Sequence, residues 1–254
     1  MTNTITLVLT ALAVLALAYA IRTIRAIHPK LSQILSAQNE LRVQNLNIAK
    51  EAGHNYRQSE AFAQLIKILD LKAPIPATRG WAGSPDLLLT LVSLVRKYKP
   101  KTIVELGSGV STLVLAKSVG RGGKVISIDN SEEYAGYTRE MLRDHGIRNV
   151  EIRVAPLKKY GNDGAEWYDL SVLKTIKRVD LLLVDGPPAT NNPAARIPAL
   201  KEFLPKLSPR AVVVLDDAIR DSEAKLADAF EKALPKHSLT KLPHEKITAV
   251  IAPK

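Results

Sequence analysis

The sequence predicts an α/β fold built on a seven-stranded, mostly parallel sheet with an antiparallel C-terminal hairpin. Five short apolar runs recur with helix-like segments between them, and the first run leads into a turn with two glycines. Continuous Val, Ile and Leu runs are typical of strands that are buried on both faces of a parallel sheet. These runs lie at Thr102–Leu106, Lys124–Asp129, Val150–Ala155, Val179–Asp185 and Ala211–Asp216.

The last two strands are predicted at His237–Leu242 and Lys246–Ile251. Only three residues join them, too few for a crossover helix, so they must pair antiparallel. Helix boundaries are also visible in the sequence. Ser84, followed by proline, is predicted to cap one helix, and Ser131, followed by two glutamates, is predicted to precede another that ends near Gly146.

Residues 1–21 contain no Asp, Glu, Lys, Arg or His. As a helix at about 1.5 Å per residue they reach about 30 Å, enough to cross the hydrocarbon core of a membrane. A cleaved signal peptide or a buried helix is the alternative, but a signal peptide requires a basic start. The basic residues follow the apolar run, at Arg22, Arg25 and Lys30. We therefore expect a single-pass anchor over residues 1–25, with the bulk of the chain in the cytoplasm.

Residues 26–73 are expected to form a helical stalk or linker before a domain at residues 74–254. Most of this segment favours helix, and it contains an apolar heptad pattern that starts at Leu31. The polar residues Gln38 and Asn45 interrupt that pattern, which argues against a stable coiled coil. The alternative is a helix that packs back on the domain. A homo-oligomer, if one forms, is expected to form through this stalk.

The turn after the first predicted strand has the features of a nucleotide-like cofactor site. Gly107 and Gly109 lack a Cβ, so the backbone can adopt positive φ and approach a ligand closely. Ser111 is predicted to cap the next helix, whose free N–H groups can bind an anionic group. Asp129, at the end of the second strand, can accept hydrogen bonds from two ribose hydroxyls. A tight turn without a ligand is the alternative.

Two residues in this stretch argue against a dinucleotide. Thr112 stands where the dinucleotide fingerprint has its third glycine, and Glu105 is acidic where such folds usually have an apolar residue. An oxidoreductase that uses NAD(P) on a similar sheet is therefore the less favoured interpretation. The favoured cofactor is S-adenosylmethionine.

Four motifs, in this order, resemble class I S-adenosylmethionine-dependent methyltransferases, in particular the subgroup known as methyltransferase domain 24. They are R-G-W-A-G-S-P-D-L at Arg79–Leu87, E-L-G-S-G-V-S-T at Glu105–Thr112, D-G-P-P at Asp185–Pro188 and D-D-A-I-R at Asp216–Arg220. The resemblance covers about residues 74–254 and implies a Rossmann-like sheet. It implies that the acid and glycines of the second motif hold the methionine part of the cofactor and that Asp129 holds the ribose. The cofactor-binding residues expected on this basis are Glu105, Gly107, Ser108, Gly109, Ser111, Asp129 and Asn130.

Asp185, Asp216 and Asp217 end the fourth and fifth strands, at the sheet edge where open α/β sheets bind ligands. We expect catalytic roles for all three. Close carboxylates repel one another unless they share a proton or hold a cation, and hard oxygen ligands suit Mg²⁺ or Ca²⁺. Catechol-type O-methyltransferases bind magnesium at similar positions, but the lysine base of those enzymes would fall at Pro188.

Neighbouring Asp216 and Asp217 would point to opposite faces of a regular strand. They can converge with Asp185 only if the strand has ended at Asp216. If they converge, we expect a divalent cation and inhibition by a chelator. If they do not, one carboxylate, most plausibly that of Asp185, acts as the base alone. The alternative is that one Asp caps the next helix and another pairs with Arg196 or Arg220.

The net charge of +11 does not indicate a nucleic-acid partner, because the basic residues are spread along the chain and only 5% of residues are aromatic. An anionic membrane surface explains the charge equally well. The sequence thus predicts a membrane-anchored methyltransferase with its catalytic domain facing the cytoplasm, which methylates an oxygen of a small-molecule, lipid or glycan acceptor. A non-catalytic, membrane-anchored scaffold that binds the cofactor is the alternative.

Overall fold

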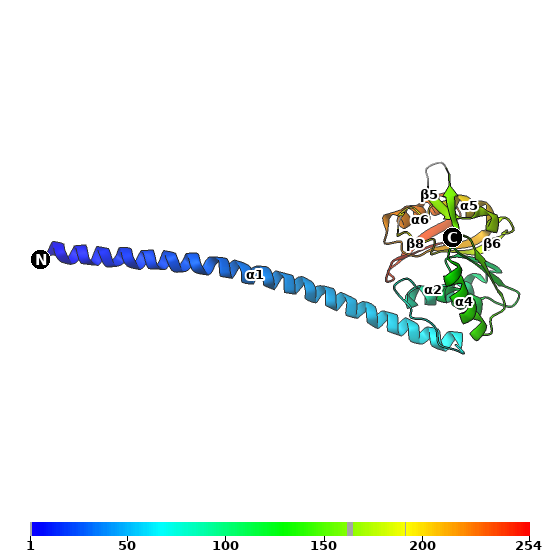
Figure 1. Cartoon of the computed structure of the whole chain (residues 1–254), viewed down its shortest axis with the longest axis horizontal. Helices are drawn as coiled ribbons and strands as arrows, with labels where there is room; N and C mark the ends of the chain where they lie inside the picture. Colours follow the sequence, from blue (N-terminus) through cyan, green and yellow to red (C-terminus); the bar gives the residue numbers. More distant parts are fainter. Residues whose placement is uncertain (1, 162–164, 191) are drawn as a thin grey trace. The chain divides into compact units, whose positions relative to one another are not determined.

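The computed structural model describes residues 2–161, 165–190 and 192–254, which divide into two compact units (Figure 1). The first unit ends at Asn55, and the second runs from Tyr56 to Lys254. Helix α1 (Thr2–Leu69) supplies the described part of the first unit and the first element of the second.

The apolar N-terminal stretch is helical, as predicted. By length and composition, α1 contains a segment that could cross a membrane, and no part of that segment is buried within the protein. Side chains such as Leu7, Leu15 and Tyr19 are 69%, 67% and 74% exposed. A signal sequence has the same properties, so retention of this segment and its insertion in a membrane stay predictions.

Seven strands form one sheet, in the order β3-β2-β1-β6-β7-β9-β8. The first five in this order are parallel neighbours, whereas β9 pairs antiparallel with both β7 and β8. The predicted Rossmann-like sheet with its antiparallel C-terminal hairpin is therefore confirmed. The strands are β1 (Thr102–Leu106), β2 (Lys124–Asp129), β3 (Val150–Val154), β6 (Val179–Val184), β7 (Leu207–Leu215), β8 (His237–Leu242) and β9 (Thr248–Pro253).

The last strand begins two residues later than predicted. The carbonyl oxygens of Lys246 and Ile247 accept hydrogen bonds from the backbone N–H groups of Ile219 and Ala218, at 3.1 and 2.8 Å. These bonds keep residues 246 and 247 in the connection between β8 and β9, which matters for the site described below.

A separate antiparallel hairpin, formed by β4 (Leu157–Tyr160) and β5 (Ala165–Tyr168), was not predicted. Its four-residue strands contain exposed lysines and too few apolar residues for a pattern. The hairpin nevertheless brings Trp167 and Tyr168 into the core, where both side chains are almost fully buried.

Helices cover both faces of the sheet (Figure 1). One core lies between the sheet and the helices α2, α3, α4 and the end of α1. The other lies between the sheet and β5, α5 and α6. The helices of the second unit after α1 are α2 (Pro85–Tyr98), α3 (Val110–Ser118), α4 (Glu132–Asp144), α5 (Pro198–Phe203) and α6 (Asp221–Ala233), with short 3-10 turns η1 (Leu170–Leu173) and η2 (Leu204–Lys206).

The predicted boundaries of α2 and α4 are confirmed. Pro85 is the first residue of α2, and the Ser131 hydroxyl accepts a hydrogen bond from the backbone N–H of Tyr134 at the start of α4. Gly146 follows α4 with φ of 67°, a conformation that glycine adopts without strain. The predicted capping by the Ser84 side chain is wrong. Ser84 directly precedes α2, but its hydroxyl donates to the Asp86 carboxylate instead of accepting from the helix backbone.

The last turns of α1, from Tyr56 onward, belong to the second unit and pack against its other elements. Ala61, Leu65 and Leu69 are buried there. The Gln58 side-chain amide donates to Asp86 Oδ2 at 2.6 Å, and the same carboxylate oxygen accepts the backbone N–H of Glu245 at 2.9 Å. One carboxylate therefore joins α1, α2 and the C-terminal hairpin.

Candidate active site

A cavity of about 380 Å³ lies at the carboxyl ends of β1, β2, β6 and β7. This is the edge at which open α/β sheets bind ligands. The loop at residues 79–83, called the rim loop here, also lines the cavity and carries Trp81, whose side chain is 84% exposed. Six of the seven predicted cofactor-binding residues, all except Glu105, also line the cavity: Gly107, Ser108, Gly109, Ser111, Asp129 and Asn130.

The glycine turn presents bare backbone to the cavity. Gly107 has φ of 94°, and a Cβ there would lie 3.5 Å from the Asp185 backbone. A Cβ on Gly109 would meet no atom within 4 Å, because that position opens into the cavity. Helix α3 begins at Val110, with Gly109 as its N-cap, so the predicted capping role of Ser111 is wrong. The helix thus starts two residues earlier than a cap at Ser111 would place it, and the Thr112 hydroxyl accepts a hydrogen bond from the backbone N–H of Gly109.

Glu105 lies beneath the glycine turn and is fully buried. Its Oε2 accepts hydrogen bonds from the hydroxyls of Thr112, at 2.6 Å, and Ser127, at 3.0 Å. Burial raises the pKa of Glu105 to about 7, although the neighbouring hydroxyls oppose the shift. In this structure the carboxyl group therefore supports the turn from below, and a direct contact with cofactor stays a prediction.

The Glu105 pKa predicts a pH dependence of stability. Between its ordinary value of 4.5 and about 7, the folded protein retains a proton that the unfolded chain has lost. The free energy of unfolding should therefore fall as the pH rises through this interval, by up to about 3 kcal/mol from this one group. Urea unfolding near pH 5 and near pH 7.5 should show a shallower decline in Glu105→Gln than in the wild type. An unchanged decline in the variant would contradict the assignment.

Asp129 connects three elements at the rim of the cavity. Its Oδ2 accepts the backbone N–H and the hydroxyl of Ser108, at 2.9 and 2.5 Å, and its Oδ1 accepts the backbone N–H of Ser131 at 2.9 Å. The glycine turn, the end of β2 and the start of α4 are thus held by one carboxylate. Oδ1 retains a lone pair that can accept a ligand hydroxyl.

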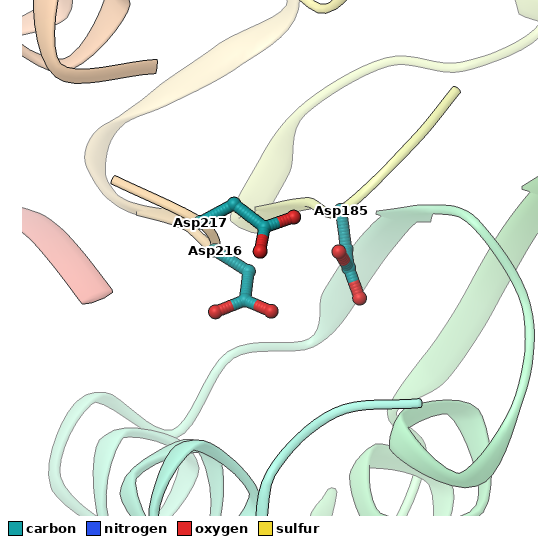
Figure 2. A group of neighbouring side chains, drawn as sticks. All are labelled: Asp185, Asp216 and Asp217. Carbon is teal, nitrogen blue, oxygen red and sulfur yellow. The ribbon is translucent and has the colours of Figure 1, made fainter. Parts of the chain in front are cut away.

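The three aspartates of the strand ends converge, as Figure 2 shows: one oxygen from each lies within 4.8 Å of the others. Strand β7 ends at Leu215, and Asp217 has φ of 57°, in the left-handed region. The alternation of a regular strand therefore no longer applies, and Asp216 and Asp217 turn toward Asp185. Asp185 and Asp217 line the cavity, whereas Asp216 lies behind them and is 1% exposed.

Positive side chains of the protein already contact these carboxylates. Arg196 Nη2 lies 3.2 Å from Asp185 Oδ1 and 3.1 Å from Asp217 Oδ2. Arg220 Nη1 lies 3.2 Å from the same oxygen of Asp217. Lys246 Nζ lies 3.8 Å from Asp216 Oδ2 and 3.8 Å from Asp217 Oδ1. The pairing of an aspartate with Arg196 or Arg220, weighed from the sequence, is thus observed together with the convergence.

A divalent cation does not fit these residues as they stand. Of the six carboxylate oxygens of the three aspartates, four are in contact with Arg196, Arg220 or Lys246. Ca²⁺ takes six to eight oxygen ligands at about 2.3–2.6 Å, and Mg²⁺ requires near-octahedral oxygen ligands. A guanidinium group beside two of the candidate ligands would repel either ion.

Burial is the main reason that the pKa of Asp185 lies well above its ordinary value, and the neighbouring Asp216 raises it further. The Arg196 guanidinium opposes this shift. The pKa of Asp216 is also raised, again mainly by burial and then by Asp217. A carboxylate that holds a proton more readily than usual is a better base near neutral pH.

Three residues of the site were missed or undervalued in the sequence. Tyr168, from the unpredicted hairpin, lines the cavity, and its buried hydroxyl has no hydrogen-bond partner among the described residues. Arg196 had been considered only as a neutralising partner, and Lys246 was not singled out. No motif marks these three residues, because the fold alone brings them to the sheet edge.

The family profile described as a methyltransferase domain matches residues 104–218, from the glycine turn to the aspartates. The chain carries a methyltransferase domain. A curated relative, protein-L-isoaspartate O-methyltransferase 2 of Archaeoglobus fulgidus, is 30% identical over 99 residues, 38% of this chain. The alignment spans 42% of that relative, less than half its length.

Solved structures show that the methyltransferase domain has the class I fold. An O-methyltransferase from Bacillus cereus, in complex with S-adenosylhomocysteine, superposes with a TM-score of 0.54 and 20% identity over 79% of this chain and 97% of that chain. The O-methyltransferase TomG from Streptomyces achromogenes, in complex with S-adenosylmethionine, gives 0.51 and 21% over 78% and 89%. The expected class I fold is thereby confirmed, and the dinucleotide-dependent alternative is not.

Proposed function

We propose that the protein is an S-adenosylmethionine-dependent O-methyltransferase. The observation that carries this proposal is the cavity itself, which is lined by an open glycine turn, by Asp129 and by Asp185. The residues fit the cofactor: Gly109 leaves space for it, and the Asp129 Oδ1 lone pair suits a ribose hydroxyl. Tyr168, whose hydroxyl has no hydrogen-bond partner in the described part of the chain, lines the same cavity. The seven predicted cofactor-binding residues are retained in the proposal, with Glu105 acting from beneath the turn.

When bound, the cofactor supplies a methyl group on a positively charged sulfur, which keeps the electron pair of the broken S–C bond as a neutral thioether. The protein has to place an acceptor oxygen in line with that bond and to remove its proton as the O–C bond forms. Asp185 is the carboxylate best placed to receive the proton, because it lines the cavity and is 17% exposed. Asp217 also lines the cavity, but both of its oxygens contact basic side chains.

The cofactor part of the proposal is tested by calorimetric titration with S-adenosylmethionine. Asp129→Ala should weaken binding roughly ten- to a hundredfold, since a hydrogen bond to a charged group contributes about 1.5–3 kcal/mol. Asp228→Ala, which changes an exposed aspartate of α6, is the control. Because Asp129 also holds Ser108 and Ser131, the thermal unfolding of each variant must be compared with that of the wild type. Unchanged affinity in folded Asp129→Ala would refute the assignment.

We infer that the acceptor is a small molecule, a lipid or a glycan, and that the enzyme works at a membrane through residues 1–21. The α1 segment described above supports the membrane part. The acid-lined cavity supports a hydroxyl acceptor. A screen with methyl-labelled cofactor and these acceptor classes tests the activity, and cofactor binding without any turnover would instead favour the non-catalytic scaffold.

The retention of the N-terminal segment and the orientation of the chain in the membrane are a separate prediction. We expect residues 1–21 to remain in the mature chain, with residues 31–254 in the cytoplasm, because the basic residues follow the apolar segment. The intact mass of protein purified from membranes reports retention, and protease protection of the C-terminal domain in sealed cells reports sidedness. A mature chain that begins near Ile21, or a domain digested from outside, would contradict it.

A further inference from the structure

We propose that the Lys246 ammonium takes the place of a divalent cation in this site and binds the acceptor oxygen during methyl transfer. The proposal rests on the O-methyltransferase function proposed above. It adds a residue outside the four sequence motifs and replaces the expectation of Mg²⁺ or Ca²⁺.

Lys246 points into the cavity from the connection between β8 and β9. Its side chain is 19% exposed and lines the cavity, and its Nζ donates a hydrogen bond to the carbonyl oxygen of Gly80 at 2.7 Å. The distances of 3.8 Å to Asp216 and Asp217 give electrostatic attraction but are too long for hydrogen bonds. An ammonium has three N–H donors, so two remain for an oxygen of the acceptor.

The backbone fixes this position. Lys246 O and Ile247 O accept hydrogen bonds from Ile219 N and Ala218 N, which directly follow Asp217. On the other side, the neighbouring Glu245 binds Arg79 of the rim loop at 2.8 Å. Lys246 is therefore held between the rim loop and the turn that follows Asp217. The buried Asp216 acts as a positioning residue for the Lys246 ammonium.

The charges of the cluster leave little need for a metal ion. Four carboxylates, those of Asp185, Asp216, Asp217 and Glu223, face three basic side chains, those of Arg196, Arg220 and Lys246. With all groups ionised the balance is one negative charge. A divalent ion would reverse that sign and stand beside two protein cations. Removing Lys246 would instead leave two excess negative charges, and Asp216 Oδ2 and Asp217 Oδ1 would lose the cation that faces them.

The test is calorimetric titration of the full-length protein with Ca²⁺ and with Mg²⁺. The wild type is expected to show no saturable binding below about 1 mM, the weak end of protein calcium sites. Lys246→Met should gain Ca²⁺ binding at least about tenfold tighter than this, because Asp216 Oδ2 and Asp217 Oδ1, which Arg196 and Arg220 do not contact, lose the cation beside them. Lys246→Arg keeps the charge and should behave like the wild type. Lys241→Met, which removes an exposed lysine from β8, is the control for surface charge.

Two results would overturn the proposal. One is wild-type binding of either ion below about 0.1 mM that Asp216→Asn abolishes. The other is a folded Lys246→Met variant that gains no Ca²⁺ affinity. Titration with S-adenosylmethionine separates this proposal from the function on which it rests: a wild type that does not bind the cofactor refutes the function, whatever the cations do. Once an acceptor is found, Lys246→Met should lower kcat and leave the cofactor Kd unchanged.

Discussion

Asp185→Asn is expected to lower kcat by about 10²- to 10⁴-fold, the usual contribution of a general base. Asparagine keeps the shape of the side chain and an oxygen at the position that Arg196 contacts, but it cannot take a proton from the acceptor. The affinity for S-adenosylmethionine should stay within about twofold of the wild type, since the change affects the chemical step. Single-turnover kinetics and calorimetric titration of the same preparation measure the two quantities.

Asp228→Asn serves as the control for this experiment, because Asp228 lies on α6 with its side chain 61% exposed and pairs with Lys241. A normal kcat in Asp185→Asn would move the role of base to Asp216 or Asp217. Normal turnover in all three single asparagine variants would leave positioning by the cofactor pocket as the whole mechanism.

Gly109→Val is expected to abolish cofactor binding while the domain remains folded. A Cβ at Gly109 meets nothing within 4 Å, and the valine branches would extend into the space that the cofactor needs. The φ of 159° at Gly109 is rarely adopted by residues with a side chain, so the variant also strains the turn and loses some stability. We expect a loss of at least about hundredfold in affinity, equivalent to about 2.7 kcal/mol. Calorimetric titration measures the affinity, and thermal unfolding checks the fold.

Gly122→Val is the matched control, because Gly122 also has a positive φ, 75°, and open space at its Cβ position but does not line the cavity. Near-normal affinity in Gly109→Val would show that the ligand does not approach this part of the turn. Loss of affinity in Gly122→Val would show that the measurement reports destabilisation from backbone strain.

The sheet could be predicted because most of its strands appear in the sequence as short apolar runs. The strands at Thr102–Leu106, Lys124–Asp129 and His237–Leu242 have the predicted bounds, since each apolar run ends at a polar turn. The β4–β5 hairpin could not be predicted in the same way. Its strands are stabilised by tertiary contacts of Trp167 and Tyr168 and lack a repeating pattern.

The same distinction applies to the candidate site: some of its residues could be predicted from sequence motifs, whereas others are placed only by tertiary packing. Gly107, Gly109 and Asp129 follow strands directly, so motif spacing was enough to place them together. The contacts of Arg196 and Lys246 with the aspartates depend on how the segment before α5 and the connection between β8 and β9 pack against the sheet edge. The left-handed turn at Asp217, which makes the aspartates converge, is set by hydrogen bonds with residues 246 and 247 and has no glycine to mark it.

The carboxylate of Asp86 has a practical consequence for shortened forms of the protein. A soluble fragment cut at the sequence-based boundary, residue 74, would lose the Gln58 amide and leave a half-buried carboxylate with one partner fewer. It would also uncover the apolar surface that Ala61, Leu65 and Leu69 cover, which favours aggregation. A fragment that starts at Tyr56 retains all four side chains and removes the whole apolar N-terminal segment, so it is the better choice for crystallisation.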